Sequence, residues 1–229
     1  HDQADDLPRR LWLEVGKYLN VKYNMKIEVA PQETTRAEAF SLWMTSPMPM
    51  VTLTKTFNVA KVLKASKRRG IKFNTLLCWC IGKAASSIKE FYILPEKDKL
   101  FKYDSIAINV IVNNSKGGIN SCDIAFNDDI QQFVRDYDEL TIQTINECKS
   151  SFIDNSMIIG TSAMIQTQLD SIVNQYTDKF CNPMVMWGKY RRNWVKTILP
   201  ISFQFHHVQM DGGHGACFLE QLQQEINKL

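Results

Sequence analysis

The 229-residue sequence lacks a long hydrophobic run, a large charge excess and any internal repeat. No stretch approaches the roughly 18 consecutive apolar residues of a membrane-spanning helix, so we expect no membrane partner. The 27 basic and 24 acidic side chains leave a net charge of +3, which is too small for binding to nucleic acid by electrostatics alone. Apolar residues make up 45% of the chain, which excludes a disordered or collagen-like protein. We expect one large globular domain or, as the second choice, two small ones.

The six cysteines lack the paired spacing of a zinc-binding site. Cys78 and Cys80 lie in the apolar stretch TLLCWCIGKAA, and thiols in such a setting are typical of buried free cysteines in a reducing compartment. The first ten residues, HDQADDLPRR, are polar and acidic, unlike a secretory signal peptide. The sequence therefore predicts a cytoplasmic protein.

The hydrophobic pattern predicts helices and strands in mixed order. Helices are expected over residues 7–19, 36–43, 58–69, 74–88, 128–148 and 212–228. Strands are expected over residues 25–31, 50–57, 101–112, 118–126, 157–165, 183–190 and 197–205. Helices in pairs and strands in hairpins favour an α+β fold, with helices on one face of a mixed sheet, and no linker divides the chain.

Three of the four histidines lie close together near the C-terminus: His206, His207 and His214, with Asp211 between them. The strand expected over residues 197–205 leads directly into the adjacent pair. Successive strand residues point to opposite faces of a sheet, so only one imidazole of the pair can face a given cleft. A neutral imidazole is a suitable general base near pH 7, which makes this segment the candidate catalytic centre.

Two other interpretations use the same residues. In the first, the adjacent histidines are partly buried and hydrogen-bond each other and the backbone. In the second, His207, Asp211 and His214 are ligands of a metal ion. The turn at Gly212 and Gly213 would make a poor rigid cage for such an ion, and no other cluster supplies a fourth ligand. We therefore predict no metal.

The string HHVQMDGGH, residues 206–214, resembles the HHxxxDG motif of the CoA-dependent acyltransferase superfamily. Its last histidine resembles the chloramphenicol acetyltransferases in particular. The other segments similar to that family are residues 36–43 and 50–64, IKF at 71–73 and WGKY at 187–190. The resemblance implies a chloramphenicol acetyltransferase-like fold, a two-layer sandwich with helices packed mainly on one face of a mixed β-sheet. It also implies an N-terminal extension of unknown role, residues 1–33, and a single CoA-dependent acyltransferase domain, residues 34–229.

The activity implied by the resemblance is that of an acetyl-CoA-dependent O-acetyltransferase. In this activity His207 is the general base that deprotonates the acceptor hydroxyl, and the acceptor oxygen attacks the thioester of acetyl-CoA directly. Asp211 pairs with Arg36 and supports the placement of His207. The remaining implied contacts are Lys72, Lys189 and Tyr190 to acetyl-CoA, and Trp43 and Met186 to the acceptor.

The transition state of acetyl transfer carries an oxyanion, so a hydrogen-bond donor must face it. The family places a serine in a strand upstream of the base, and an ungapped count back from His207 reaches Gly160. A shift of one or two residues restores a hydroxyl, so we predict Thr161 or Ser162 as the donor. Residues 166–173, QTQLDSIV, differ from the family's acceptor-pocket residues, so the acceptor side is less similar than the cofactor side.

The resemblance also implies a homotrimer with an active site at each subunit interface, because a single lobe presents His207 from one face only. The implied acceptor is chloramphenicol or a related hydroxylated small molecule, and the implied role is antibiotic resistance. A second hypothesis is a catalytically impaired protein that serves as a structural or oligomerising core, such as a dihydrolipoyl acyltransferase-like core domain. A third is transfer of another thiol-borne acyl group, such as acyl-lipoyl.

Overall fold

The computed structural model describes residues 25–194 and 196–229, so the helix expected over residues 7–19 lies outside the described residues. The strands are β1 (Lys26–Val29), β2 (Met50–Asn58), β3 (Ile93–Glu96), β4 (Lys99–Tyr103), β5 (Ile106–Asn113), β6 (Ile119–Ala125), β7 (Met157–Met164), β8 (Met184–Gly188), β9 (Arg191–Arg192) and β10 (Thr197–His206). The helices are α2 (Ala37–Trp43), α3 (Ala60–Arg69), α4 (Phe73–Ser86), α5 (Ile130–Glu147) and α6 (Gly212–Lys228), together with the short 3-10 helices η1 (Pro31–Glu33) and η2 (Lys89–Tyr92).

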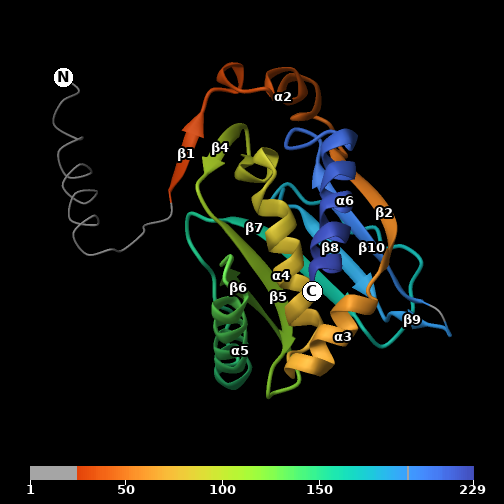
Figure 1. Cartoon of the computed structure of the whole chain (residues 1–229). Helices are drawn as coiled ribbons and strands as arrows, with labels where there is room; N and C mark the ends of the chain where they lie inside the picture. Colours follow the sequence, from red (N-terminus) through yellow and green to blue (C-terminus); the bar gives the residue numbers. More distant parts are fainter. Residues whose placement is uncertain (1–24, 195) are drawn as a thin grey trace.

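The main sheet runs in the order β2-β10-β8-β7-β5-β6, and β9 pairs with the start of β10. Strand β7 is parallel to both β8 and β5, whereas the other neighbours are antiparallel. Helices α3, α4, α5 and α6 lie on one face of this sheet (Figure 1). The predicted α+β sandwich, with a mixed sheet and helices mainly on one face, is therefore confirmed.

The core lies between the sheet and the helices. In β10 the alternate apolar residues from Leu199 to Phe205 are fully buried in this layer, whereas Ser202 and Gln204 point to the other face. Helix α4 is buried on nearly all sides, as its apolar sequence predicts. Helix α3 ends at Gly70, whose φ of 67° is the left-handed conformation that glycine adopts readily.

The segment 101–112, expected as one strand, forms two strands in different sheets. Strand β4 lies between β1 and β3 in a small three-stranded sheet, whereas β5 belongs to the main sheet. The chain changes sheets at Asp104, whose carboxylate accepts the N–H of Met25 at 2.9 Å. Periodicity does not indicate β3, because Pro95 in its middle cannot donate to a ladder.

Strand β1 lies inside the expected N-terminal extension and pairs with β4 of the domain, with Lys26 opposite Tyr103. Lys26 also forms an ion pair with Glu96 of β3, with Nζ and Oε2 2.5 Å apart. The last residues of the extension are therefore packed on the domain. The boundary at residue 34 stays a prediction.

The side of the main sheet opposite the helices, which carries Gly160, Met184 and Gln204, is the open face. The segment between β7 and β8 crosses it, because the N–H of Ile172 donates to Ser202 Oγ at 2.9 Å. Gln204 Nε2 likewise donates to a backbone carbonyl of that segment at 3.1 Å. Within residues 25–194 and 196–229, no helix has the length and apolar character needed to cross a bilayer.

Candidate active site

The adjacent histidines at the end of β10 have different surroundings. His206 is buried, and its Nδ1 accepts the N–H of Val208 at 3.1 Å. Burial, with a smaller effect of the neighbouring His207, lowers the pKa of His206 from 6.5 to about 4. The side chain of His207 remains partly exposed. Of the two rings, His207 is therefore the one that a substrate can reach.

The low pKa of His206 predicts a loss of stability in mild acid. Between pH 6.5 and 4 the unfolded chain binds a proton at this residue that the folded chain does not bind, so the free energy of unfolding falls as the pH decreases. In His206→Asn the amide oxygen can replace Nδ1 as the acceptor, and this variant should lose less stability across the window. Thermal melts from pH 7 to pH 4 measure the difference, and equal pH slopes for the two proteins would contradict the prediction.

The backbone and one aromatic ring fix the position of His207. Its N–H donates to the carbonyl of Pro49 at 2.7 Å, and its carbonyl accepts from Arg36 Nη2 at 2.9 Å. Its ring stacks on Trp43, with centroids 4.7 Å apart and the planes 6° from parallel. His207 Nδ1 lies 3.5 Å from Asp211 Oδ1 and makes no hydrogen bond among the described residues. The imidazole is thus held in place, with no hydrogen bond at its Nδ1.

Arg36 and Asp211, which the resemblance implies to pair, form a bidentate ion pair. Arg36 Nη1 donates to Asp211 Oδ2 at 2.7 Å, and Nη2 donates to Oδ1 at 2.8 Å. Arg36 Nε donates to the carbonyl of Val208 at 2.8 Å. The hydrogen bonds from Arg36 are the main cause of the lowered pKa of Asp211. The buried guanidinium therefore ties together the turn that carries His207.

His214 forms part of the capping arrangement at the start of α6. Its Nδ1 accepts the N–H of Asp211 at 3.1 Å, and its Nε2 lies 3.3 Å from Glu90 Oε1. The ring thus links the histidine turn to η2. In the part of the chain that the structure describes, no group of three or more His, Cys, Asp or Glu side chains is placed to hold a metal ion.

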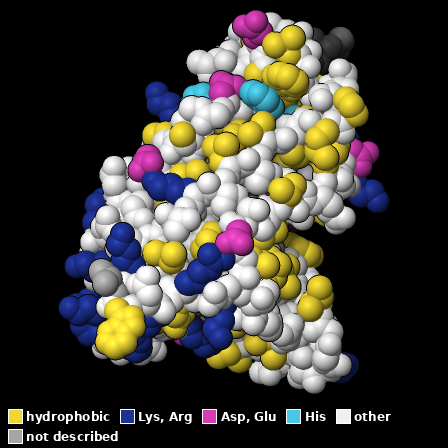
Figure 2. Space-filling view, turned by 90° about the vertical axis from the view of Figure 1, so that its right-hand side faces the viewer, with side chains coloured by type: hydrophobic (Ala, Val, Ile, Leu, Met, Phe, Trp, Pro, Cys, Tyr) yellow, Lys and Arg dark blue, Asp and Glu magenta, His cyan; other side chains and the backbone are white. Residues whose placement is uncertain are grey.

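The three residues predicted to contact acetyl-CoA line one cleft of about 540 Å³: Lys72, Lys189 and Tyr190. Phe73 and Trp187 supply apolar wall, and the Phe73 ring lies 5.4 Å from the Tyr190 ring. The cleft lies away from His207: Trp187 pairs with Ile201 in the middle of β10, six residues before His207. This separation corresponds to roughly 20 Å along the strand. In Figure 2 the histidines likewise lie toward one end of the molecule, whereas Lys and Arg gather toward the other.

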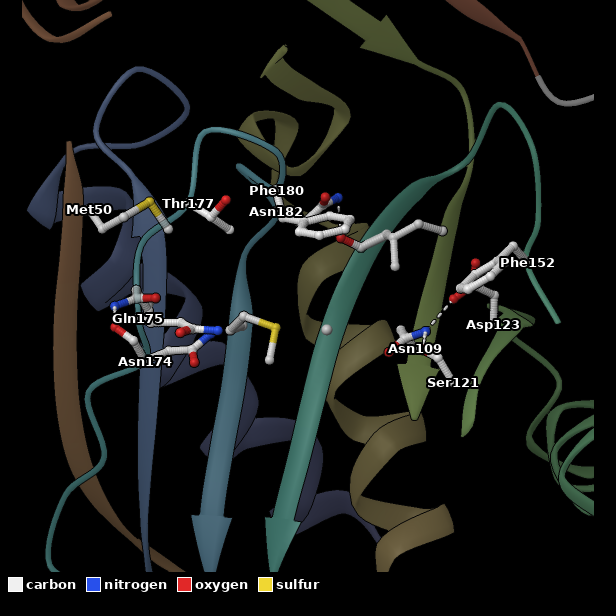
Figure 3. Close-up of a pocket in the computed structure, with 14 residues that line it drawn as sticks. Met50, Asn109, Ser121, Asp123, Phe152, Asn174, Gln175, Thr177, Phe180 and Asn182 are labelled. Carbon is white, nitrogen blue, oxygen red and sulfur yellow. Dashed lines mark hydrogen bonds between the residues drawn. The ribbon is translucent and has the colours of Figure 1, made fainter. Parts of the chain in front are cut away.

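A second cavity, of about 440 Å³, lies on the open face (Figure 3). Gly160, Met184 and Gln204 line it, and so does Met50, the residue that follows Pro49. A Cβ at Gly160 would come within 2.0 Å of Met184 Sδ, so a serine at this position would require Met184 to move. This cavity was not indicated by the sequence; Asn109 of β5 and Ser121 and Asp123 of β6 form its far wall.

The two predicted oxyanion donors point to opposite sides of β7. The Thr161 side chain is buried, and its Oγ1 donates to the carbonyl of Asn109 at 2.7 Å. Ser162 shares the face of Gly160 and lies opposite Met186 in β8, a predicted acceptor contact. The structure thus brings Ser162 and Met186 together, between the two cavities, and separates Thr161 from them.

A mixed sheet with helices on one face thus carries, at the end of β10, a histidine turn tied by a buried arginine. The family model described as chloramphenicol acetyltransferase matches residues 23–223. The chain belongs to the chloramphenicol acetyltransferase family, which confirms the predicted family and enzyme class.

Curated relatives agree with this family, and solved structures share the fold. Chloramphenicol acetyltransferase 3 of Escherichia coli is 24% identical over 183 residues, covering 76% of this chain and 84% of the relative. A solved chloramphenicol acetyltransferase has a TM-score of 0.76 at 20% identity, covering 88% of this chain and all of the other. A probable dihydrolipoamide acetyltransferase from Listeria monocytogenes has a TM-score of 0.65 at 12% identity, covering 88% of this chain and 94% of the other.

Proposed function

We propose that the protein is an acetyl-CoA-dependent O-acetyltransferase whose acceptor is chloramphenicol or a related hydroxylated small molecule. The observation that carries this proposal is the arrangement of His207, a partly exposed imidazole held by Pro49, Trp43 and Arg36 with no hydrogen bond at Nδ1. His207 takes the acceptor proton, the acceptor oxygen bonds to the acetyl carbon, and the carbon–sulfur bond breaks. The proton then passes to the departing CoA sulfur, which leaves an acetyl ester, CoA thiol and neutral imidazole.

The cleft lined by Lys72, Lys189 and Tyr190 fits the chemistry of acetyl-CoA. Lysine ammonium groups suit phosphates as point charges. The apolar side chains of Phe73 and Trp187 suit the uncharged arm that carries the thioester. Lys72 Nζ is exposed and 3.6 Å from a carboxylate of α5, so an incoming phosphate can compete for it. We infer that this cleft binds the co-substrate and that no metal takes part.

We further propose a homotrimer with active sites at its interfaces. Within one chain the His207 ring stacks on Trp43 and remains 28% exposed, and the cofactor cleft is distant. Phe152 and Phe180 expose large apolar surfaces on the rim of the open-face cavity. A neighbouring subunit that covers this face would supply the missing wall of the site. Sedimentation at equilibrium should give three times the chain mass.

Thiol release from acetyl-CoA tests the function directly. We expect release that depends on chloramphenicol or on another member of a panel of hydroxylated antibiotics, which would also support a role in antibiotic resistance. The competing function is a structural core, favoured by Gly160 where the family has serine. No thiol release with any acceptor, no CoA binding and particles much larger than a trimer would establish that competing function.

Replacing Ser162 by alanine tests the oxyanion donor. Loss of one such donor costs about 10²–10³-fold in kcat, and we expect that loss with little change in KM. Thr161→Val is the matched control: it removes a hydroxyl bonded to a backbone carbonyl, so it should cost about 1 kcal/mol of stability and leave kcat nearly unchanged. Full kcat in Ser162→Ala, measured by initial rates of thiol release, would refute the assignment.

A further inference from the structure

At its β6 end, the wall of the open-face cavity contains a buried carboxylate. Asp123 is 3% exposed, yet it lines the cavity, and Figure 3 shows it beside Asn109, Ser121 and Phe152. Asn109 Nδ2 donates to Asp123 Oδ1 at 2.6 Å, and the N–H of Ile153 donates to Asp123 Oδ2 at 3.0 Å. Both carboxylate oxygens thus act as acceptors. Within residues 25–194 and 196–229, no Lys, Arg or His forms an ion pair with Asp123.

The cavity wall also carries a hydrogen-bond acceptor that has no donor. Gln204 is 2% exposed, and its Nε2 donates to Thr52 Oγ1 and to the carbonyl of Asn174, both at 3.1 Å. Its Oε1 is buried and has no hydrogen-bond partner among the described residues. A buried charge without a counterion and a buried acceptor without a donor both cost free energy. A ligand of this cavity should therefore supply donors and positive charge.

Aromatic rings complete the wall. Phe152 and Phe180 are 69% and 68% exposed, and both line the cavity. In Figure 3 Phe152 lies next to Asp123, while Phe180 lies on the other side of β7, near Asn182. The face of an aromatic ring attracts a cation, and its surface also packs against an apolar body. An anionic group beside one aromatic ring, with a second ring across the cavity, suits an amphipathic molecule that carries an ammonium ion.

The cavity also extends toward Ser162, the predicted oxyanion donor. Gly160 is two strands from Asp123 in the order β7-β5-β6, which is about 10 Å at the usual strand spacing. Ser162 follows Gly160 on the same face. A molecule with its ammonium group at Asp123 would place a group several atoms away beside the predicted oxyanion donor.

We propose that the open-face cavity binds an acceptor alcohol that carries an ammonium group, with Asp123 as the residue that holds the cation. This inference rests on the proposed function, because the hydroxyl of the same molecule is the group that receives acetyl. The amine stays protonated and is not acetylated. Among the hydroxylated small molecules proposed as acceptors, Asp123 thereby favours cationic, amphipathic alcohols over a neutral one such as chloramphenicol.

A pair of probes of equal shape tests the charge requirement. The two probes are 4-(aminomethyl)benzyl alcohol and 4-ethylbenzyl alcohol. They differ only in that the first has an ammonium group where the second has a methyl group. Titration calorimetry on the wild-type protein should show the ammonium probe binding at least tenfold more tightly. In Asp123→Asn that preference should vanish, while affinity for the ethyl probe stays the same. Asp128→Asn, at an exposed acid paired with Lys83, is the matched control and should behave as wild type.

Several outcomes would overturn the inference. They are equal binding of the two probes to wild type, equal weakening of both in Asp123→Asn, and no binding of either probe because a second copy of the chain fills the cavity. The wild-type comparison decides the matter even if Asp123→Asn fails to fold. Binding needs no turnover, so preference for the ammonium probe without acetylation would refute the proposed function and keep the cation site. Acetylation of neutral alcohols, with no preference for the ammonium probe in binding, would support the proposed function and refute the cation site.

Discussion

His207→Ala should lower the rate of acetyl transfer by roughly 10²–10⁴-fold, the usual contribution of a positioned general base. The loss should fall on kcat, because the variant removes the group that takes the acceptor proton. The turn itself should persist, since its contacts to Pro49 and Arg36 use the backbone of residue 207. Rates of thiol release at saturating acetyl-CoA measure the effect.

Two controls separate loss of the base from loss of structure in this variant. The cofactor cleft, with Lys72 and Lys189, is roughly 20 Å from His207 along β10, so the affinity for CoA should remain within about twofold of wild type. The mass in solution should also stay the same, because the substitution removes a partly exposed ring. Retained turnover in a variant with both properties intact would show that another residue is the base.

Arg36→Ala should cause the largest loss of stability, about 3–5 kcal/mol, because two backbone carbonyls lose a buried donor at about 1–3 kcal/mol each and the ion pair to the half-exposed Asp211 is lost as well. The guanidinium donates to Asp211 twice and to the carbonyls of His207 and Val208, and these buried carbonyls would lose their donor. At about 2–4 °C per kcal/mol for a chain of this size, the melting temperature should fall by roughly 6–20 °C. Scanning calorimetry measures the shift.

Substitutions of Arg36 and of Asp211 should lower the stability of the protein by different amounts. Asp211→Asn removes a carboxylate that is about half exposed and keeps one acceptor, so it should cost much less than Arg36→Ala. Arg36→Lys keeps the charge but cannot form the paired hydrogen bonds, and its cost should lie between the two. A melting temperature of Arg36→Ala equal to that of wild type would mean that the pair does not stabilise the turn.

Much of the fold was predictable because its signals are local. Helix α6 begins at Gly212 after Asp211, and α5 begins after Asp129, whose side chain accepts the N–H of Gln131 at 2.9 Å. Capping of this kind depends on neighbours in sequence, which periodicity and composition report. The division of residues 101–112 between two sheets depends instead on partners far along the chain, and no local pattern carries that information.

The candidate site, like the fold, was only partly predictable from the sequence. The motif at residues 206–214 identified the family and singled out His207 and Asp211. Alternation along β7 showed that Thr161 and Ser162 face opposite sides, but not which of them faces the helices. Packing of the helices against one face decided this, because it buried Thr161 and left Ser162 with Gly160 on the open face.

Short patterns of neighbouring residues were enough to predict most of the helices and strands, the family and the histidine motif. The separation of the cofactor cleft from His207 along β10, the partial exposure of His207 beside the buried His206, and the place of Asp123 in a cavity with Gln204 depend on three-dimensional packing. Strand pairing brings these residues together from distant segments, and burial without a counterion is a property of their surroundings, not of their order in the chain.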